Sequence, residues 1–302
     1  MLRDDRALLS IITLNYNQTT VTCQFLESLK KLKYRNFEVL VCDMASSVDP
    51  TTEIESGNYP NTRILLSKKN LGFAAGNNWG MQHAKGDFFF IVNNDTEVTE
   101  DLLDKLLQPF AVNGSIGVTC PKIRYFDPSN LIQYAGFNPM SPYTGRTTTI
   151  GEKEIDQGQY DASRSTFGAH GCAMLVKREV AERTGKFPER FFLYYEEWDW
   201  SSRILKAGYI IWYTGDALIY HKESVSVGKN NPMKVFYHTR NRIMYMRRNT
   251  NWRQLIVFTL FFTFISIPKS VIGFVTNGQF TQLKYFLKGI LWNLYSSSDS
   301  VV

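Results

Sequence analysis

The 302-residue sequence is poor in cysteine, and the cysteines it has form no metal or disulfide framework. They are Cys23, Cys42, Cys120 and Cys172. No CxxC pair or histidine-rich neighbourhood accompanies them, which argues against a structural zinc site. Scattered thiols of this kind are typical of a reducing, cytosolic compartment. The first residues also lack signal-peptide features, because the apolar run at 7–14 is short and has no small-residue cleavage pattern.

The common phosphate-binding fingerprints are missing too. The chain contains neither a GxGxxG segment after a predicted strand nor a Walker motif, so dinucleotide and ATP sites lose support. Its formal charge of +6 and pI near 9.0 favour anionic partners such as nucleic acid, phosphorylated metabolites or an acidic lipid surface. No nucleic-acid recognition motif accompanies the charge, and we expect no nucleic-acid partner.

Apolar runs of strand length alternate with segments of helical period in the first third of the chain. Strands are predicted at residues 8–14, 37–43, 62–67 and 87–92. An amphipathic helix lies between the first two, with Phe25 and Leu29 on its apolar face. This alternation predicts an α/β fold with a mainly parallel, Rossmann-like sheet flanked by helices.

Later segments carry weaker signals. Thr99 is the expected N-cap of a helix whose apolar face begins at Leu102. Residues 137–164 are rich in Pro, Gly, Thr and Ser and predict an irregular loop near a site. A helix is expected over 196–207, ended by Gly208.

Polar residues follow the predicted strands where each one ends. Parallel sheets bind ligands at the carboxyl ends of their strands, so these residues, together with small residues between the third and fourth strands, are candidates for nucleotide-sugar contacts. The candidates are Asn15, Asn17, Asp43, Ser46, Gly72, Phe73, Gly76, Asn77, Asn93 and Asn94. Turn chemistry and helix capping are the alternative explanation for each of them taken singly.

Asp95 directly follows a very apolar strand, so its carboxylate should enter the cleft. A divalent cation that bridges a diphosphate needs only one or two protein carboxylates. His221 ends the last predicted pair of strands, at 209–214 and 217–220, and offers a nitrogen ligand that suits Mn²⁺ better than Mg²⁺. Asp95 and His221 are therefore the predicted metal ligands.

Three acids open the helix at 196. Glu196, Glu197 and Asp199 stand among aromatic residues, an arrangement that suits a general base beside a sugar ring. Acids at a helix N-terminus also interact favourably with its dipole. The residues alone leave open which of the three is the base, and they predict an Asp199–Arg203 pair.

In combination, these motifs resemble the inverting family-2 glycosyltransferases of the GT-A fold, in particular their rhamnosyltransferase-like branch. The resemblance covers residues 7–248 and rests on LNYN, VCDMASS, NLGFAAGNNWG, IVNNDTEV, FGAHGCAMLVKR, FPERFFLYYEEWDW and YHKESVS. It implies that Asp43 contacts the nucleotide base and that Asp95 is the metal-binding acid. It also implies that Glu197 is the catalytic base, and His221 a metal or diphosphate contact.

A basic and aromatic C-terminal arm, residues 226–302, follows the expected catalytic domain at 1–225. Its apolar run at 255–267 has about 13 residues before Pro268, fewer than the ~20 of a spanning helix. Basic residues beside such a run favour a peripheral membrane helix. A true membrane span and a homo-oligomer interface are the alternatives. We expect a location on the cytoplasmic, inner face of the cell membrane.

The expected reaction moves a sugar, with rhamnose from its thymidine diphosphate as the preferred donor, to a hydroxyl with inversion, aided by Mg²⁺ or Mn²⁺. The expected acceptor is a glycan, on a polyprenyl diphosphate carrier by preference, in the assembly of cell-surface polysaccharide or glycoprotein glycans. The alternative is a catalytically silent module that binds nucleotide sugars or a membrane partner.

Overall fold

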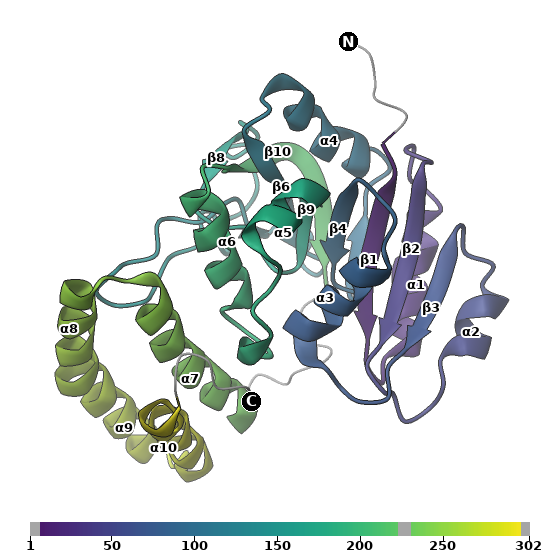
Figure 1. The fold of residues 1–302 in the computed structure, drawn as a ribbon. Helices are drawn as coiled ribbons and strands as arrows, with labels where there is room; N and C mark the ends of the chain where they lie inside the picture. The colour runs from purple at the N-terminus through teal and green to yellow at the C-terminus, as the bar shows by residue number, and fades with distance from the viewer. Residues whose placement is uncertain (1–6, 223–230, 297–302) are drawn as a thin grey trace.

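A mixed sheet forms the centre of the molecule (Figure 1). The computed structural model describes residues 7–222 and 231–296, and in these ranges ten strands join one sheet, whose main path runs β3-β2-β1-β4-β9-β6-β10-β5. The strands are β1 Leu9–Asn15, β2 Phe37–Asp43, β3 Thr62–Leu66, β4 Phe88–Val92, β5 Thr96–Val98, β6 Ile116–Tyr125, β7 Ile132–Tyr134, β8 Arg164–Thr166, β9 Ala173–Lys177 and β10 Ile210–His221.

The half of the sheet built from β1 to β4 is parallel throughout. β1, β2 and β4 read as continuous apolar runs because both of their faces are covered, and their side chains are almost all buried. The four strands predicted from the sequence are confirmed to within a residue at each end. The carboxyl ends of all four strands lie at the same end of the sheet. We call this C-terminal end of the strands the sheet edge, and it lies on the side of the arm in Figure 1.

Beyond β4 the sheet becomes mixed. β9 runs antiparallel to both β4 and β6, and β10 runs parallel to β6. The two strands predicted at 209–214 and 217–220 are one strand, β10, with a register shift between Thr214 and Leu218. This irregularity lets a single strand continue past Gly215 to reach His221 at the sheet edge. The α/β class is confirmed.

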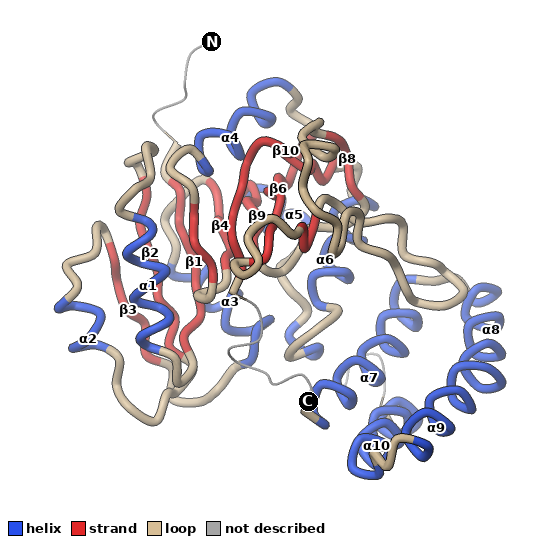
Figure 2. Tube along the Cα trace, turned by 180° about the vertical axis from the view of Figure 1, so that it is seen from behind, coloured by secondary structure: helices blue, strands red, loops and turns tan. Residues whose placement is uncertain are grey.

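Helices cover both faces of the sheet, with α3 and α5 toward the viewer in Figure 1 and α1 toward the viewer in Figure 2. The α-helices are α1 Thr19–Leu29, α2 Thr51–Ser56, α3 Gly72–His83, α4 Leu102–Val112, α5 Arg178–Thr184, α6 Glu196–Lys206, α7 Pro232–Asn249, α8 Trp252–Phe261, α9 Ile267–Thr276 and α10 Phe280–Tyr295, with short turns η1 Glu189–Phe191 and η2 Phe262–Ser266.

Two local predictions have different outcomes. The prediction that Thr99 caps α4 was wrong, because its hydroxyl donates instead to the carbonyl of Leu218 at 2.8 Å and ties the segment to β10. The irregular path expected over 137–164 is confirmed, apart from isolated antiparallel pairings of Phe137 with Thr149 and of Ile155 with Leu131. A buried ion-pair cluster of Lys122 and Arg124 with Asp156 anchors this loop to β6.

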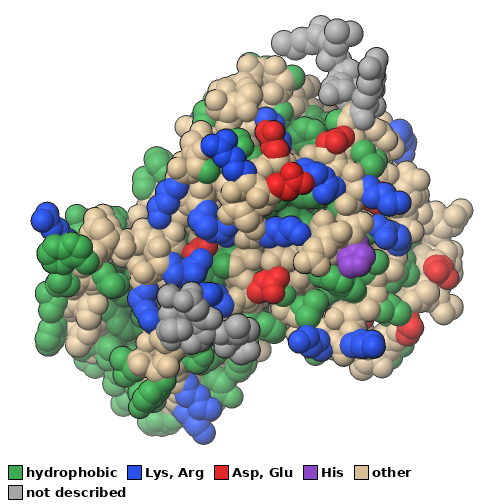
Figure 3. Space-filling model, viewed as in Figure 1, with side chains coloured by type: hydrophobic (Ala, Val, Ile, Leu, Met, Phe, Trp, Pro, Cys, Tyr) green, Lys and Arg blue, Asp and Glu red, His purple; other side chains and the backbone are tan. Residues whose placement is uncertain are grey.

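The arm contains a longer apolar helix than the sequence predicted. α8, the π-turn η2 and α9 form one helical run over Trp252–Thr276, whose 25 residues have the length and composition of a membrane-crossing helix. The expected end before Pro268 was wrong, since Pro268 lies in the first turn of α9 and follows a π-turn that accommodates the ring. Only 17% of its most apolar stretch is buried. Figure 3 shows hydrophobic side chains gathered over this part of the arm.

The segment that joins the arm to the sheet lies outside the described residues. It contains the expected boundary at 225/226 and the end of the YHKESVS motif. On the described side, α7 packs between α6 and α10, so this helix contacts the catalytic body and the arm alike.

Candidate active site

A chain of hydrogen bonds joins the carboxyl ends of β1, β2 and β4. The amide of Asn15 donates to Asp43 at 2.8 Å, and the hydroxyl of Thr22 donates to Asn15 at 2.8 Å. Asn94 in turn donates to the Thr22 hydroxyl at 2.9 Å. The structure therefore brings together three of the predicted residues through Thr22, which the sequence reasoning missed because its position in α1 carries no motif.

The same carboxylate orders the loop after β2. Both the backbone N–H and the hydroxyl of Ser46 donate to Asp43, and the backbone N–H of Asn17 donates to the Ser46 hydroxyl at 2.8 Å. Asp43 is only 3% exposed, whereas Asn17 and Ser47 lie at the surface. Asp43 thus holds the loops of the sheet edge in one arrangement. Its contact with the base of the nucleotide remains a prediction.

The glycines of the 70–78 segment are required by packing inside the protein. Gly72 has φ +73°, and a Cβ there would come within 2.5 Å of the Phe192 ring. A Cβ on Gly76 would come within 2.9 Å of the Met44 sulfur. These two positions explain why small residues occur at the start of α3, without reference to a bound nucleotide.

Phe73 and Asn77 also face the interior. The Phe73 ring packs edge-on against Phe187, with 5.6 Å between centroids, and Asn77 donates to the Phe73 carbonyl at 2.9 Å. Asn78, which was not predicted, donates to the Phe187 carbonyl at 2.8 Å and to Glu189 at 2.9 Å. Helix α3 is thereby tied to the segment that leads to α6.

Asp95 and His221 meet at the sheet edge, as predicted. Nε2 of His221 lies 3.1 Å from Oδ1 of Asp95, both side chains are buried, and Nδ1 of His221 contacts Gln133 at 2.7 Å. β10 delivers the imidazole because its last residue pairs with Thr96, next to Asp95. Gln133 orients the ring and could not be predicted, since it lies on a different strand of the sheet.

This pair fits a divalent cation that is bound mostly by its substrate. Oδ1 of Asp95 has no hydrogen-bond partner among the described residues beyond its ion-pair contact with His221. Within the same residues, no group of three or more His, Cys, Asp or Glu side chains gathers. An ion held by Asp95 and His221 would therefore complete its shell with phosphate oxygens and water, which Mn²⁺ and Mg²⁺ accept.

Asn93 contributes through its backbone. Its N–H donates to the Cys172 carbonyl at 2.9 Å, and its carbonyl accepts from the Thr96 hydroxyl at 2.8 Å. These bonds fix the turn that carries Asp95.

Helix α7 shapes the loop that precedes the three acids. Phe192, Tyr194 and Tyr195 all have positive φ, between 63° and 73°, a conformation that costs free energy for non-glycine residues. The Asn241 amide donates to the carbonyls of Phe191, Leu193 and Tyr194 at 2.7–3.0 Å. A residue of the arm thus holds the strained loop that leads into α6.

The three candidate bases have different surroundings. Asp199 accepts from Arg203 at 3.0 Å, Arg248 at 2.8 Å and Asn249 at 3.0 Å. Burial raises the pKa of Asp199, but these donors outweigh burial and leave its pKa below the ordinary value. Asp199 therefore ties α6 to α7, the predicted pair with Arg203 is confirmed, and its carboxylate is not free to accept a proton.

Glu196 and Glu197 behave in the opposite way. Burial, reinforced by the neighbouring Glu197, raises the pKa of Glu196 well above its ordinary value. Burial raises the pKa of Glu197 to about 7. Each has a buried Oε2 without a hydrogen-bond partner in the described structure. A carboxyl group with a pKa near 7 is well matched to general-base catalysis at neutral pH.

The indole rings near the acids belong to the core. Trp200 is 1% exposed and donates to Thr184, while Trp198 packs on Phe137 with 4.3 Å between centroids. Both indoles are buried against different neighbours, Phe137 for Trp198 and Phe187 for Trp200, so neither of these two rings presents a face to a sugar.

Comparison with known proteins agrees with this geometry. Residues 10–185 match the family model described as Glycosyl transferase family 2, which is more than half of the chain. The chain belongs to this family. This glycosyltransferase is 25% identical over 283 residues to the N-acetylglucosaminyl-diphospho-decaprenol L-rhamnosyltransferase of Mycobacterium tuberculosis, covering 84% of this chain and 89% of that protein.

A second relative is the O-antigen biosynthesis protein RfbC of Myxococcus xanthus, 26% identical over 204 residues, covering 66% of the glycosyltransferase and 16% of that protein. Among solved structures, the mannosyltransferase PcManGT of Pyrobaculum calidifontis, in complex with GDP-Man and Mn²⁺, superposes with a TM-score of 0.60 at 15% identity, covering 95% and 87% of the two chains. S. aureus TarS residues 1–349 with UDP-GlcNAc give 0.59 at 16% identity, covering 93% and 79%. These neighbours confirm the GT-A fold for the glycosyltransferase.

Proposed function

We propose that this glycosyltransferase moves L-rhamnose, with inversion, from a nucleoside diphosphate to a hydroxyl of a glycan carried on a polyprenyl diphosphate. The observation that carries the proposal is the convergence of Asp95 and His221 at the sheet edge, where a diphosphate-bridging cation fits. The similarity to the mycobacterial rhamnosyltransferase, which spans most of both chains, supports the donor sugar and the acceptor class.

In this reaction Glu197 removes the proton of the acceptor hydroxyl. The acceptor oxygen forms a bond to the anomeric carbon from one side while the bond from that carbon to the donor phosphate breaks on the other, which inverts the configuration. Asp95 and His221 would hold Mn²⁺ or Mg²⁺, which when bound neutralises charge on the departing diphosphate. Asp43 and its bonded loops orient the nucleotide end of the donor.

Membrane attachment forms part of the proposal. The acceptor lies in a bilayer, and the exposed apolar helix of the arm offers a surface that inserts at its cytoplasmic interface. The helix is also long enough to cross the membrane. If a membrane-binding test is negative, the exposed apolar face is instead a self-association surface.

The decisive experiment incubates purified protein with Mn²⁺, thymidine-diphosphate rhamnose and a GlcNAc-diphosphate-lipid acceptor. We expect a disaccharide-lipid whose new linkage is inverted relative to the donor by NMR. Retained configuration would refute the single displacement. Tight binding of the nucleotide sugar without transfer to any lipid-linked acceptor, and without hydrolysis, would favour the silent binding module instead.

A further inference from the structure

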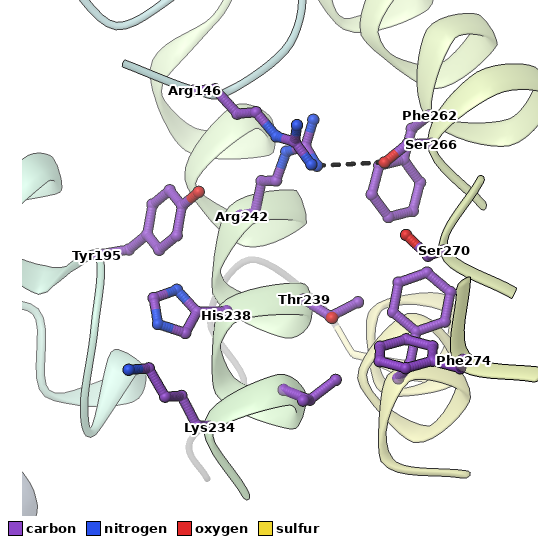
Figure 4. Close-up of a pocket in the computed structure, with 12 residues that line it drawn as sticks. Arg146, Tyr195, Lys234, His238, Thr239, Arg242, Phe262, Ser266, Ser270 and Phe274 are labelled. Atoms are coloured by element: carbon purple, nitrogen blue, oxygen red, sulfur yellow. Dashed lines mark hydrogen bonds between the residues drawn. The ribbon is translucent and has the colours of Figure 1, made fainter. Parts of the chain in front are cut away.

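A pocket of about 400 Å³ lies between the arm and the loop before α6, and we call it the arm pocket (Figure 4). Its lining combines cations with aromatic rings. Arg146, Lys234 and Arg242 supply the charge, and Phe262, Phe274 and Phe286 supply the apolar surface. A lining of this composition suits a ligand that is anionic at one end and hydrocarbon at the other.

The cations of the arm pocket have no acidic ion-pair partner in the part of the chain that the structure describes. None of the three forms a salt bridge with a carboxylate in residues 7–222 and 231–296. Figure 4 shows the guanidinium groups of Arg146 and Arg242 close to each other, near Ser266. Burial lowers the pKa of Arg242 to about 10, and the nearby Arg146 acts in the same direction. An exposed cation next to a buried one favours an anion between or beside them.

Arg242 is held in place by the protein itself. Its guanidinium donates to the Thr144 carbonyl and, at 3.3 Å, to the Ser266 hydroxyl. One bond reaches the loop before β8 and the other reaches the apolar helix, so Arg242 fixes the two walls of the pocket relative to each other. Arg146 is exposed and Lys234 is partly exposed, so these two cations can meet a ligand.

The arm pocket is lined by the residue that precedes the first turn of α6, the helix that carries the proposed catalytic base. Tyr195 lines it, donates to the Gly145 carbonyl at 3.0 Å, and precedes Glu197 by two residues. A second cavity of about 430 Å³ shares Arg146, Ser266 and Phe274 and continues along the apolar helix. The polar part of the pocket is thus close to α6, and the apolar part leads toward the exposed hydrophobic face of the arm.

We infer that the arm pocket binds the diphosphate and first isoprene units of the lipid-linked acceptor, which positions the acceptor sugar toward Glu197. The inference rests on the proposed function and adds to it a site separate from the sheet edge, where the donor binds. Arg146 and Lys234 contact the phosphates, and the three phenylalanines contact the hydrocarbon. The exposed apolar face of the arm then meets the same bilayer that holds the rest of the lipid.

The first test compares single-charge removals. We expect Arg146→Ala and Lys234→Ala each to raise KM for the lipid-linked acceptor by roughly tenfold, which is about 1.4 kcal/mol, while the Kd for thymidine diphosphate with Mn²⁺ stays unchanged. Arg35→Ala is the matched control, because it removes an exposed positive charge from the segment before β2, which lines neither the arm pocket nor the apolar helix. Equal KM increases in all three variants would overturn the inference.

The second test identifies the ligand by thermal shift with four probes: farnesyl diphosphate, farnesol, inorganic pyrophosphate and vesicles of phosphatidylglycerol in phosphatidylcholine. We expect farnesyl diphosphate alone to raise Tm strongly, and Arg146→Ala to abolish that shift. Equal stabilisation by pyrophosphate or by the anionic vesicles would overturn the lipid-diphosphate assignment. Absence of nucleotide binding would refute the proposed function, whereas nucleotide binding without a farnesyl diphosphate shift would refute only this inference.

Discussion

The sheet edge and the arm differ in how far their side chains find partners within the protein. At the sheet edge, Asn15, Asp43 and Thr22 bond to one another, so the loops are ordered before any ligand arrives. At the arm pocket, Lys234 of the arm and Arg146 of the 137–164 loop form no ion pair with a described carboxylate, and the arm residues Phe264 and Ile272 are 71% and 62% exposed. The loops at the sheet edge are therefore ordered by their own bonds, while the arm leaves apolar side chains exposed, a pattern typical of an interaction surface.

The largest effect should come from the metal-binding acid at the sheet edge. Asp95→Ala should lower transfer by roughly 10³-fold or more while the fold stays intact, because the charge on the departing diphosphate loses its stabilisation. Steady-state kinetics with added Mn²⁺ and circular dichroism would measure both quantities. Glu55→Gln, an exposed acid in α2, is the control. Wild-type transfer in excess chelator would refute the metal assignment.

The second effect concerns the base. Glu197→Gln should lower kcat by about 10²- to 10⁴-fold with little change in donor affinity. Since burial raises the pKa of Glu197 to about 7 and the base must be ionised, wild-type kcat/KM should fall as the pH drops below about 7. Rates measured from pH 5 to 9 would show this limb. If Glu196→Gln causes the loss and Glu197→Gln does not, the base is the neighbouring residue.

The third prediction concerns the stability of the fold, to which Asp199 and Glu196 contribute in opposite directions. Asp199→Asn breaks a buried network with Arg203 and Arg248, and should destabilise the fold by about 3 kcal/mol. Glu196→Gln should raise Tm at pH 8, where the native protein holds a desolvated glutamate with a raised pKa. The unfolded Glu196 ionises at lower pH than the folded one, so this gain should shrink toward pH 4. Thermal melts at both pH values would test it, and a lower Tm for Glu196→Gln would contradict the assignment.

The smallest effect is electrostatic and belongs to the arm. Full-length protein should float with anionic liposomes at low salt and less so at high salt, since each Lys or Arg near the surface contributes ~1 kcal/mol that salt screens. Leu260→Ser with Phe264→Ser should weaken flotation at both salt concentrations. A protein that stays soluble throughout and elutes as a defined oligomer would show that the apolar helix mediates assembly.

Truncation after Asn249 removes the whole apolar helix and tests the same contrast between the sheet edge and the arm. It should release the protein from membranes and stop transfer to lipid-linked acceptors. It also removes α10, where Asn293 donates to the Arg240 carbonyl and Trp292 packs on the Arg240 guanidinium. We therefore expect a lower Tm but retained binding of nucleotide and Mn²⁺, which calorimetry would measure.

Much of the catalytic domain was predictable because local patterns and tertiary packing agree there. The strand at 37–43 has the predicted bounds, and Asp95 meets His221 although 126 positions separate them in the numbering of the chain. The two residues meet because strands that run in the same direction bring their carboxyl ends to one side of the sheet, and their role as metal ligands stays a prediction. It failed at Thr99 and at Pro268, where a tertiary hydrogen bond and a π-turn override the usual capping and helix-ending signals.

The roles within the acidic cluster could not be read from the sequence. Glu196, Glu197 and Asp199 are the same kind of residue at neighbouring positions, and their pKa values diverge only because of what surrounds them. Asp199 pairs with Arg203 of its own helix α6 and with Arg248 of α7. Asn241, which holds the loop before α6, also comes from α7.

The sequence by itself determined the α/β class and the candidate acids, because apolar periodicity and strand-end polarity are local properties of the chain, and its combined motifs resemble the family whose model it matches. The tertiary structure alone decided which acid is ion-paired and which is desolvated, why Gly72 and Gly76 are small, and where the arm forms a cationic pocket. Those properties depend on burial and on distances between residues far apart in the chain. A linear pattern carries no information on either until the segments pack together.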